Sequence, residues 1–504
     1  MVDDNPIEAQ NQSTPDPNAE VESHPVFESV PTDSVGVPVE VPEEVAPEVA
    51  TPSQEEIAQT VPQMTGDDGS PVIYKESRNL IFFIGAGVIF FIILLFIFLK
   101  VFFGGAGAKK DITLTYWGLW EEKEVFEPLI EEYRKKNPHV KIDYIKMSPQ
   151  DYRDKLLTRG KNGTGPDMYR FHNTWLPEIK EVASPLPRSI MSSDEFEKTF
   201  YKIHQTDLKV GNDYYGLPLE IDGLVMIYND GLLKKSGILK PPATWDELLT
   251  DVVKISVKGT NGEIITSGVA LGTTANIDHF SDIFALMLIQ NGGSLRKLNE
   301  PEAIGALESY RKFAETPNNI WDENMPSSTL SFIQEKVAII FAPSWQVMVI
   351  KATNPDIALK VAAIPPIPGA NRVSIANYWV EGVSRYSKNQ LEAWKFLKFL
   401  TEKENMTKLY ETQAKTRLFG EPYSRVDLAP FLAQNEYIGA VVQQGDSYVS
   451  VPAIYRTYDN GLNDGVVKYL ENAINATITG VTPLEALGTA KTGVDALFSQ
   501  FNIR

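Results

Sequence analysis

The sequence predicts an α/β protein. Within residues 111–504, segments of alternating apolar and polar residues, typical of strands, are interleaved with segments whose apolar residues recur at helical spacing. A strand, a helix and a second strand at the start of this region predict a right-handed parallel crossover. The full length of 504 residues is compatible with roughly two to four structural units.

Residues 1–74 form an acidic segment that differs from the rest of the chain. They contain 16 Asp or Glu and no Lys or Arg, and the run from Val37 to Pro52 reads VPVEVPEEVAPEVATP. Proline recurs too often for a helix and large apolar residues are scarce, so we predict a disordered tail. The remaining residues carry 50 acidic and 47 basic side chains, a nearly neutral balance that argues against a nucleic-acid partner.

The chain contains no cysteine. Disulfides, thiolate metal sites and cysteine nucleophiles are therefore excluded. An anchor through a lipidated cysteine is excluded as well, so any membrane attachment must be a segment of the polypeptide.

One apolar segment is long enough to cross a membrane. Asn79 to Leu99 are 21 residues without a charge, and at about 1.5 Å per residue they would span roughly 30 Å as a helix. We predict a transmembrane helix over residues 79–103, followed by a flexible linker at residues 104–110. Lysines and arginines flank both ends in nearly equal numbers, so charge alone does not orient it.

The folded region begins with a regular pattern. Residues 112–117 alternate as a strand, residues 121–136 place apolar side chains on one helix face, and residues 140–145 alternate again. Further on, Thr244 and Glu247 have the spacing of a helix capping box. Residues 391–400 and 483–498 predict amphipathic helices.

Several motifs in this region follow one another in the order of a known family. They are ITLTYWGLW from Ile112, EEYRKKNPHVKIDY from Glu131, GPDM from Gly165, YGLP from Tyr215, GLVMIYND from Gly223, GILKPPATWDEL from Gly237, FIQEKVAII from Phe332 with Ser344-Trp345, and SKNQLEAWKFLKFL from Ser387. Over residues 111–504 the chain resembles the family 1 extracellular solute-binding proteins, which include the maltose-binding type.

The resemblance implies a periplasmic-binding-protein fold, in which two α/β lobes joined by hinge crossovers close on a ligand. Lobe 1 would comprise about residues 111–222 and 375–430, and lobe 2 about residues 223–370 and 435–504. It also implies an ABC permease as partner. A solute-capturing domain must face outward, so we expect a single-pass cell-membrane protein with a cytoplasmic N-terminus and an extracytoplasmic C-terminal domain. Typical members lack such an uncleaved anchor.

Sugar capture requires aromatic rings for the C–H faces and polar groups for the hydroxyls, in a crevice at the carboxyl ends of strands. The resemblance assigns a sugar-contacting carboxylate to Asp222 and a stacking tryptophan to Trp345. The complete set of predicted ligand-binding residues is Trp120, Asn173, Trp175, Glu220, Asp222, Trp345, Trp379 and Glu381. Weaker candidates are Trp117, Phe171, His172, Tyr455 and Arg456, whereas Trp245 and Trp394 lie in predicted helices and are assigned to the core.

We predict neither catalysis, nor a cofactor, nor a metal site. Residues 460–471 match a calcium loop at Gly465 and Glu471, but Leu462 stands where an oxygen ligand is required. No histidine pair has metal-binding spacing, and nucleotide-binding and nucleophile-elbow motifs are absent from the sequence. The predicted function is capture of a sugar or oligosaccharide for an ABC importer. The alternatives are a ligand-sensing membrane receptor or scaffold and a tethered glycoside hydrolase.

Overall fold

The computed structural model describes residues 89–95 and 110–503, which belong to two separate compact units divided between residues 97 and 98. Residues 89–95 are helical. They are the only described part of the predicted span at residues 79–103. The predicted tail and linker residues 104–109 lie outside the described residues. Among the described residues, no helix has the length and apolar character needed to cross a membrane.

A five-stranded sheet forms the first lobe of the larger unit. Its strand order is β2 (Val140–Lys146), β1 (Ile112–Gly118), β3 (Met168–His172), β13 (Trp379–Val383) and β6 (Leu217–Pro218). Strand β1 runs parallel to β2 and β3, as the predicted crossover requires, whereas β13 is antiparallel to its neighbours. The strand β13 enters this sheet from a distant part of the sequence.

Helices cover the first sheet with their apolar faces. Helix α2 buries Phe126, Leu129, Ile130 and Tyr133, and it packs against β2, α13 and α14. The helices of this lobe are α2 (Lys123–Lys136), α3 (Tyr152–Lys161), α4 (Leu176–Ile179), α5 (Ser193–Thr199), α6 (Lys202–Asp207), α13 (Gln390–Leu400) and α14 (Lys403–Gln413), with the 3₁₀ turn η1 (Asn173–Trp175) and the hairpin β4 (Lys209–Val210) and β5 (Asp213–Tyr214).

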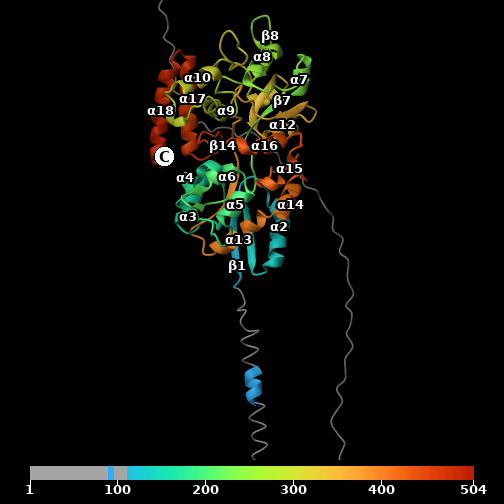
Figure 1. The fold of residues 1–504 in the computed structure, drawn as a ribbon, viewed down its shortest axis with the longest axis vertical. Coiled ribbons are helices and arrows are strands. Elements are labelled where there is room, and N and C mark those ends of the chain that lie inside the picture. Colours follow the sequence, from blue (N-terminus) through green and yellow to red (C-terminus); the bar gives the residue numbers. More distant parts are fainter. Residues whose placement is uncertain (1–88, 96–109, 504) are drawn as a thin grey trace, which may run out of the picture. The chain divides into compact units, whose positions relative to one another are not determined.

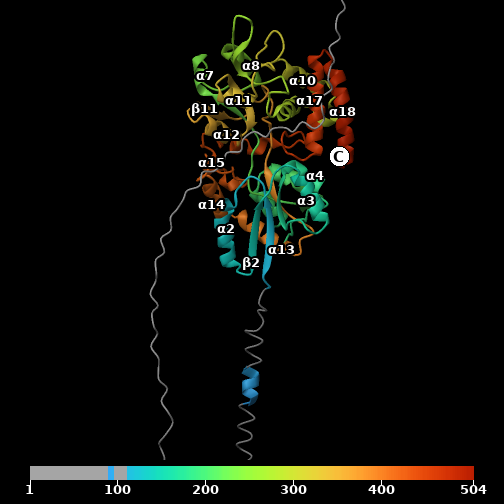
Figure 2. The same cartoon turned by 180° about the vertical axis from the view of Figure 1, so that it is seen from behind.

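A second sheet, also of five strands, lies in the second lobe, whose helices α7, α8 and α12 are labelled in Figures 1 and 2. Its order is β11 (Leu359–Ala362), β7 (Leu224–Asn229), β10 (Val337–Pro343), β9 (Ile264–Val269) and β8 (Val257–Lys258). The helices of this lobe are α7 (Asp230–Lys235), α8 (Trp245–Ile255), α9 (Phe280–Gln290), α10 (Pro301–Arg311), α11 (Ser328–Ile333), α12 (Gln346–Thr353), α17 (Leu462–Ile478) and α18 (Pro483–Gln500), with η2 (Leu295–Lys297). Helices α17 and α18 pack against each other, α17 against α9 and α18 against α10.

Three crossover segments carry the chain between the lobes: residues 219–223, residues 363–378 and residues 414–461. The second contains β12 (Ser374–Ile375), and the third contains η3 (Val426–Leu428), α15 (Ala429–Leu432), α16 (Gly439–Gln443), η4 (Gly445–Ser447) and β14 (Tyr448–Val449). Strands β12 and β14 pair in parallel, and Gly223 bridges Ala376. A side chain on Gly223 would clash with the Ile375 carbonyl oxygen, so the close approach of two crossovers requires glycine there.

The local sequence signals agree with these elements. The strands predicted at residues 112–117 and 140–145 are β1 and β2, and the helices predicted at residues 391–400 and 483–498 are α13 and α18. The Thr244 side chain accepts a hydrogen bond from the Glu247 N–H at the start of α8, which confirms the predicted cap. The mixed α/β fold that the sequence predicts is therefore confirmed for residues 110–503.

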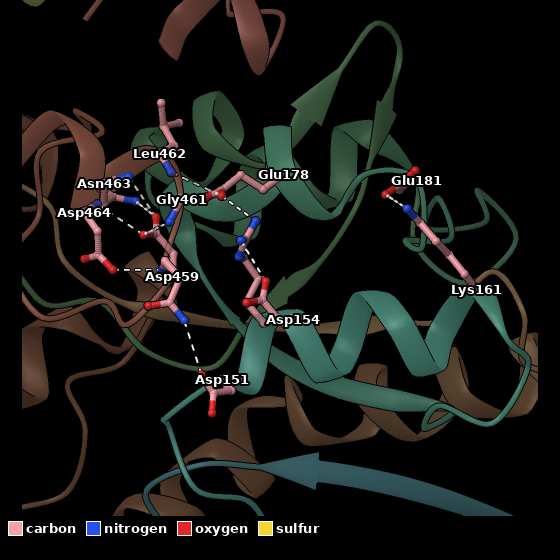
Figure 3. A network of polar contacts seen from close by, with 12 residues as sticks. Asp151, Asp154, Lys161, Glu178, Glu181, Asp459, Gly461, Leu462, Asn463 and Asp464 are labelled. Carbon is pink, nitrogen blue, oxygen red and sulfur yellow. Dashed lines mark hydrogen bonds and ion pairs between the residues drawn. The ribbon is translucent and has the colours of Figure 1, made fainter. Parts of the chain in front are cut away.

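A buried polar network joins α3 and α4 of the first lobe to the start of α17 (Figure 3). Arg153 Nη1 lies 2.7 Å from Glu178 Oε2, which also accepts from the Leu462 N–H at 3.3 Å. Asp459 accepts hydrogen bonds from the N–H groups of Gly461, Asn463 and Asp464, and from the Asn463 side chain. These bonds satisfy the free N–H groups at the beginning of α17.

Glu178 is the most strongly perturbed acid of this network. Its side chain is fully buried, and its Oε1 has no hydrogen-bond partner among the described residues. Burial, and next the charge of Asp459, raise the pKa of Glu178 from 4.5 to about 9, which outweighs the opposing effect of Arg153. Between these two values the folded protein holds a proton that the unfolded chain releases. The contribution of Glu178 to stability is therefore fully present below pH 4.5 and is lost as the pH rises toward 9.

Replacing this acid tests that assignment. Glu178→Gln keeps the shape of the protonated acid and removes its titration. We compare the free energy of unfolding of the variant of the full chain with that of wild type at each pH. We expect this difference to be more favourable to the variant at pH 8 than at pH 5 by at least ~1.4 kcal/mol, the free energy of one pKa unit. Urea unfolding at both pH values measures this gain. Glu181→Gln, which alters a half-exposed partner of Lys161, is the matched control. An equal difference for Glu178→Gln at both pH values would contradict the assignment.

Candidate functional site

A cavity of about 440 Å³ lies between the two lobes. Its wall combines strand ends and crossovers of both lobes, because the carboxyl ends of parallel strands point toward the same edge of a sheet. The residues that line it are Trp120, His172, Glu220, Asp222, His279, Trp345, Met348, Val349, Asn377, Trp379, Arg417, Glu421, Tyr455, Arg456, Thr457 and Tyr458. A smaller cavity of about 200 Å³, which includes Trp245 in its wall, lies elsewhere in the second lobe.

Aromatic rings face the larger cavity from both lobes. In the first lobe, Trp120 and Trp379 meet edge to face, with ring centroids 5.5 Å apart, and Trp175 packs behind Trp379 at 5.3 Å. In the second lobe, Trp345 meets His279 at 5.9 Å. Trp120 is 41% exposed, so much of its ring is accessible. Such rings can pack against apolar surfaces of a ligand while polar groups between them form hydrogen bonds with its polar atoms.

Asp222 connects the first crossover to the start of α12. Its Oδ1 accepts from the N–H groups of Gly223 at 2.7 Å and Ser344 at 3.1 Å, and its Oδ2 accepts from the Trp345 N–H at 3.4 Å. Burial raises the pKa of Asp222 to about 7, although the hydrogen bonds from Gly223 and Ser344 favour the ionised form. Both carboxylate oxygens are thus engaged in positioning the backbone at Trp345.

Glu220 has a similar role toward the other lobe. Its Oε1 accepts a hydrogen bond from the Trp379 N–H at 2.9 Å. Within residues 110–503, no hydrogen bond occupies its Oε2, and the residue lines the cavity. Burial, followed by the charge of Glu421, raises the pKa of Glu220 well above its ordinary value. This oxygen can accept a hydrogen bond from a ligand.

A group of charged residues lies behind Glu220. Arg170 is almost completely buried and donates to Glu121 at 2.6 Å and to Glu381 at 2.7 Å. Ligand atoms of Glu121, Glu220 and Glu421 lie within 4.8 Å of one another, a spacing that could hold a metal ion. However, Arg170 already pairs with Glu121, and Arg417 lies 2.8 Å from Glu421. Guanidinium groups thus already pair with Glu121 and Glu421, whereas no ion pair within residues 110–503 involves Glu220.

Five of the eight predicted site residues line the cavity: Trp120, Glu220, Asp222, Trp345 and Trp379. The other three lie outside its lining, each engaged in contacts within the protein. Asn173 donates to Asp207 at 3.0 Å and to Ser450 at 2.8 Å, Trp175 is buried behind Trp379, and Glu381 pairs with Arg170. Of the weaker candidates, His172, Tyr455 and Arg456 line the cavity, while Trp117 and Phe171 are buried in the core.

The sequence analysis did not select several of the lining residues. They are His279, Met348, Val349, Asn377, Arg417, Glu421, Thr457 and Tyr458. Most of them come from loops and crossovers, where no periodic pattern indicates which side chains face inward. Asn377 could have been selected from the sequence, because it lies two residues before the predicted site residue Trp379, on a crossover that the resemblance implies.

A two-lobed α/β fold with a ligand-sized cavity between the lobes defines a solute-binding protein. The family profile described as bacterial extracellular solute-binding protein matches residues 118–407. This chain therefore belongs to that family, which consists of binding proteins rather than enzymes.

Relatives and solved structures agree with this assignment. The chain is 26% identical over 292 residues to a binding protein of Brucella abortus, covering 57% of this chain and 71% of that protein. It is 26% identical over 301 residues to the maltotriose-binding protein of Pyrococcus abyssi, covering 57% and 61%. A cyclo/maltodextrin-binding protein complexed with maltotetraose matches with a TM-score of 0.64 and 22% identity over 78% of this chain and 98% of that chain. An ABC transporter solute-binding protein of Thermotoga lettingae, bound with α-D-tagatose, matches at 0.60 and 23% over 77% and 100%.

Proposed function

We propose that this protein captures a sugar or oligosaccharide outside the cytoplasm and delivers it to an ABC importer. The main support is the cavity between the lobes, where tryptophans of both lobes surround carboxylate and amide groups. A neutral, hydroxyl-rich molecule suits such a wall, because its C–H faces stack on rings and its hydroxyls pair with polar groups. The names of the relatives and the ligands of the similar structures favour the same class of solute.

The proposed mechanism is closure of the lobes around the ligand. Trp345 in the second lobe and Trp379 in the first would contact opposite sides of the sugar only when the lobes are close together. Such contacts favour the closed conformation by their differential affinity for it. The three adjacent crossovers would serve as the hinge, with the pairing of β12 and β14 preserved. The closed form would then be recognised by the permease subunits.

Loss of a cavity tryptophan tests the sugar site. We expect Trp345→Ala in the full chain to weaken sugar binding about 30-fold, because a central aromatic contact contributes ~2 kcal/mol to binding. Titration calorimetry with glucose, maltose, maltotriose, maltotetraose and tagatose provides the measurement. Trp245→Ala, in the same lobe but at the smaller cavity, is the matched control and should bind as wild type does. The proposal fails if wild type binds none of these sugars, or if Trp345→Ala binds as tightly as wild type.

We further propose that residues 79–103 anchor the protein as a single-pass helix, with the acidic tail in the cytoplasm. The support is the run of 21 uncharged residues from Asn79 to Leu99, followed by the linker at residues 104–110. The family is described as extracellular, which favours a binding domain that faces outward. An anchored protein would remain beside its transporter instead of diffusing to it.

Cell fractionation tests the anchor. We expect the full chain to stay with membranes after a carbonate wash, and a variant lacking residues 79–103 to be released, since no other segment of the sequence is comparably apolar. A variant lacking residues 1–70 should remain bound. External protease should remove the binding domain but leave the tail protected. Release of the full chain by the wash would disprove the anchor.

A further inference from the structure

A continuous chain of hydrogen bonds leads from the start of α17 to the wall of the cavity. It passes from Asn463 through Thr174 and His172 to Asn377. The side chains of Asn463, Thr174 and His172 are buried, and Asn377 is half-buried. His172 and Asn377 both line the cavity. The direction of each bond can be deduced from groups whose donor or acceptor character is fixed.

The direction begins at Asn463, which is labelled in Figure 3. Its Oδ1 accepts from the backbone N–H of Ile454 at 3.2 Å, and its Nδ2 donates to the carboxylate of Asp459 at 2.9 Å. A backbone N–H can only donate and a carboxylate can only accept, so the amide orientation is determined. The same Nδ2 donates to Thr174 Oγ1 at 2.8 Å.

Thr174 transmits this direction to His172. Its hydroxyl oxygen accepts from Asn463, so its own proton is available for His172 Nδ1, 2.8 Å away. The backbone N–H of Thr174 also donates to this Nδ1, at a distance of 3.4 Å. His172 Nδ1 is therefore an acceptor, and the ring proton is on Nε2. Burial lowers the pKa of His172 to about 4, in agreement with a neutral ring.

The tautomer of His172 determines the orientation of Asn377. The Nε2–H group lies 3.1 Å from Asn377 Oδ1 and must donate to it. The backbone N–H of Asn377 is held by the Asp222 carbonyl oxygen at 2.9 Å. With its oxygen and its backbone both engaged, Asn377 has its Nδ2 available, and no hydrogen bond within residues 110–503 uses that group.

We propose that Asn377 is a ligand-binding residue that donates from Nδ2 to an oxygen of the captured solute, and that His172, Thr174 and Asn463 are positioning residues which hold it in this orientation. This inference rests on the proposed function and narrows its ligand class. Asn377 offers a donor and Glu220 offers an acceptor on the same wall. A single hydroxyl group can pair with either residue, because it both donates and accepts. The wall thus suits a solute that carries several hydroxyl groups.

Binding measurements on the full chain test the proposal, using calorimetry with the five sugars named above. We expect Asn377→Ala to weaken binding about tenfold, and Thr174→Val to weaken it about fivefold, because one directed hydrogen bond is lost or misoriented. Thr174→Ser keeps the hydroxyl and should restore wild-type affinity. Asn261→Ala, in an exposed turn of the second lobe, is the control. Thermal unfolding of each variant separates loss of binding from loss of fold.

The tautomer of His172 provides a readout that does not depend on a ligand. Nitrogen-15 NMR of histidine-labelled protein should show His172 as the neutral Nε2–H form at pH 7, and Thr174→Val should change its Nδ1 signal. If wild type binds none of the sugars, the proposed function fails, and the tautomer alone decides the orientation of Asn377. If wild type binds but a folded Asn377→Ala variant binds equally well, only this inference fails. An Nδ1–H or doubly protonated His172 overturns it as well.

Discussion

Two carboxylates on one short crossover accept hydrogen bonds from the backbone N–H groups of the cavity tryptophans. Glu220 accepts the N–H of Trp379 in the first lobe, and Asp222 accepts the N–H of Trp345 at the start of α12 in the second lobe. The crossover thus fixes the aromatic walls of both lobes through a segment that belongs to neither sheet. In the proposed closing motion, in which this crossover is part of the hinge, a change in lobe angle would change the distance between the two tryptophans.

Burial of so many acids near the cavity is compensated in several different ways. Asp222 accepts hydrogen bonds from backbone N–H groups, and Arg170 is buried between Glu121 and Glu381. A buried pair of this kind contributes little net stability but is costly to break, so it fixes geometry more than it lowers the free energy of folding. Glu220 keeps one oxygen unused by the described residues. The arrangement leaves a rigid wall in which a few polar atoms remain available for a solute.

More of the fold than of the site could be predicted from the sequence. Alternation in β1 and β2, the apolar face of α2 and the cap at Thr244 are local signals that survive in the structure. Site residues depend on contacts between distant segments, which local patterns do not encode. Asn173, Trp175 and Glu381 are near cavity residues in sequence but lie outside the cavity lining, because Asn173 binds Asp207, Trp175 packs against Trp379 and Glu381 pairs with Arg170. His279 lines the cavity and its Nδ1 lies 2.8 Å from Asp282 Oδ2, a contact that a single sequence does not reveal.

The central claim is that one solute is held between Trp345 and Trp379. The most direct test is a crystal structure of the protein with the sugar that binds it most tightly in calorimetry. The account predicts a sugar ring between these two tryptophans, with hydroxyl groups directed at Glu220 and Asn377. A sugar bound elsewhere, such as the smaller cavity beside Trp245, with the space between the lobes left to solvent, would contradict it.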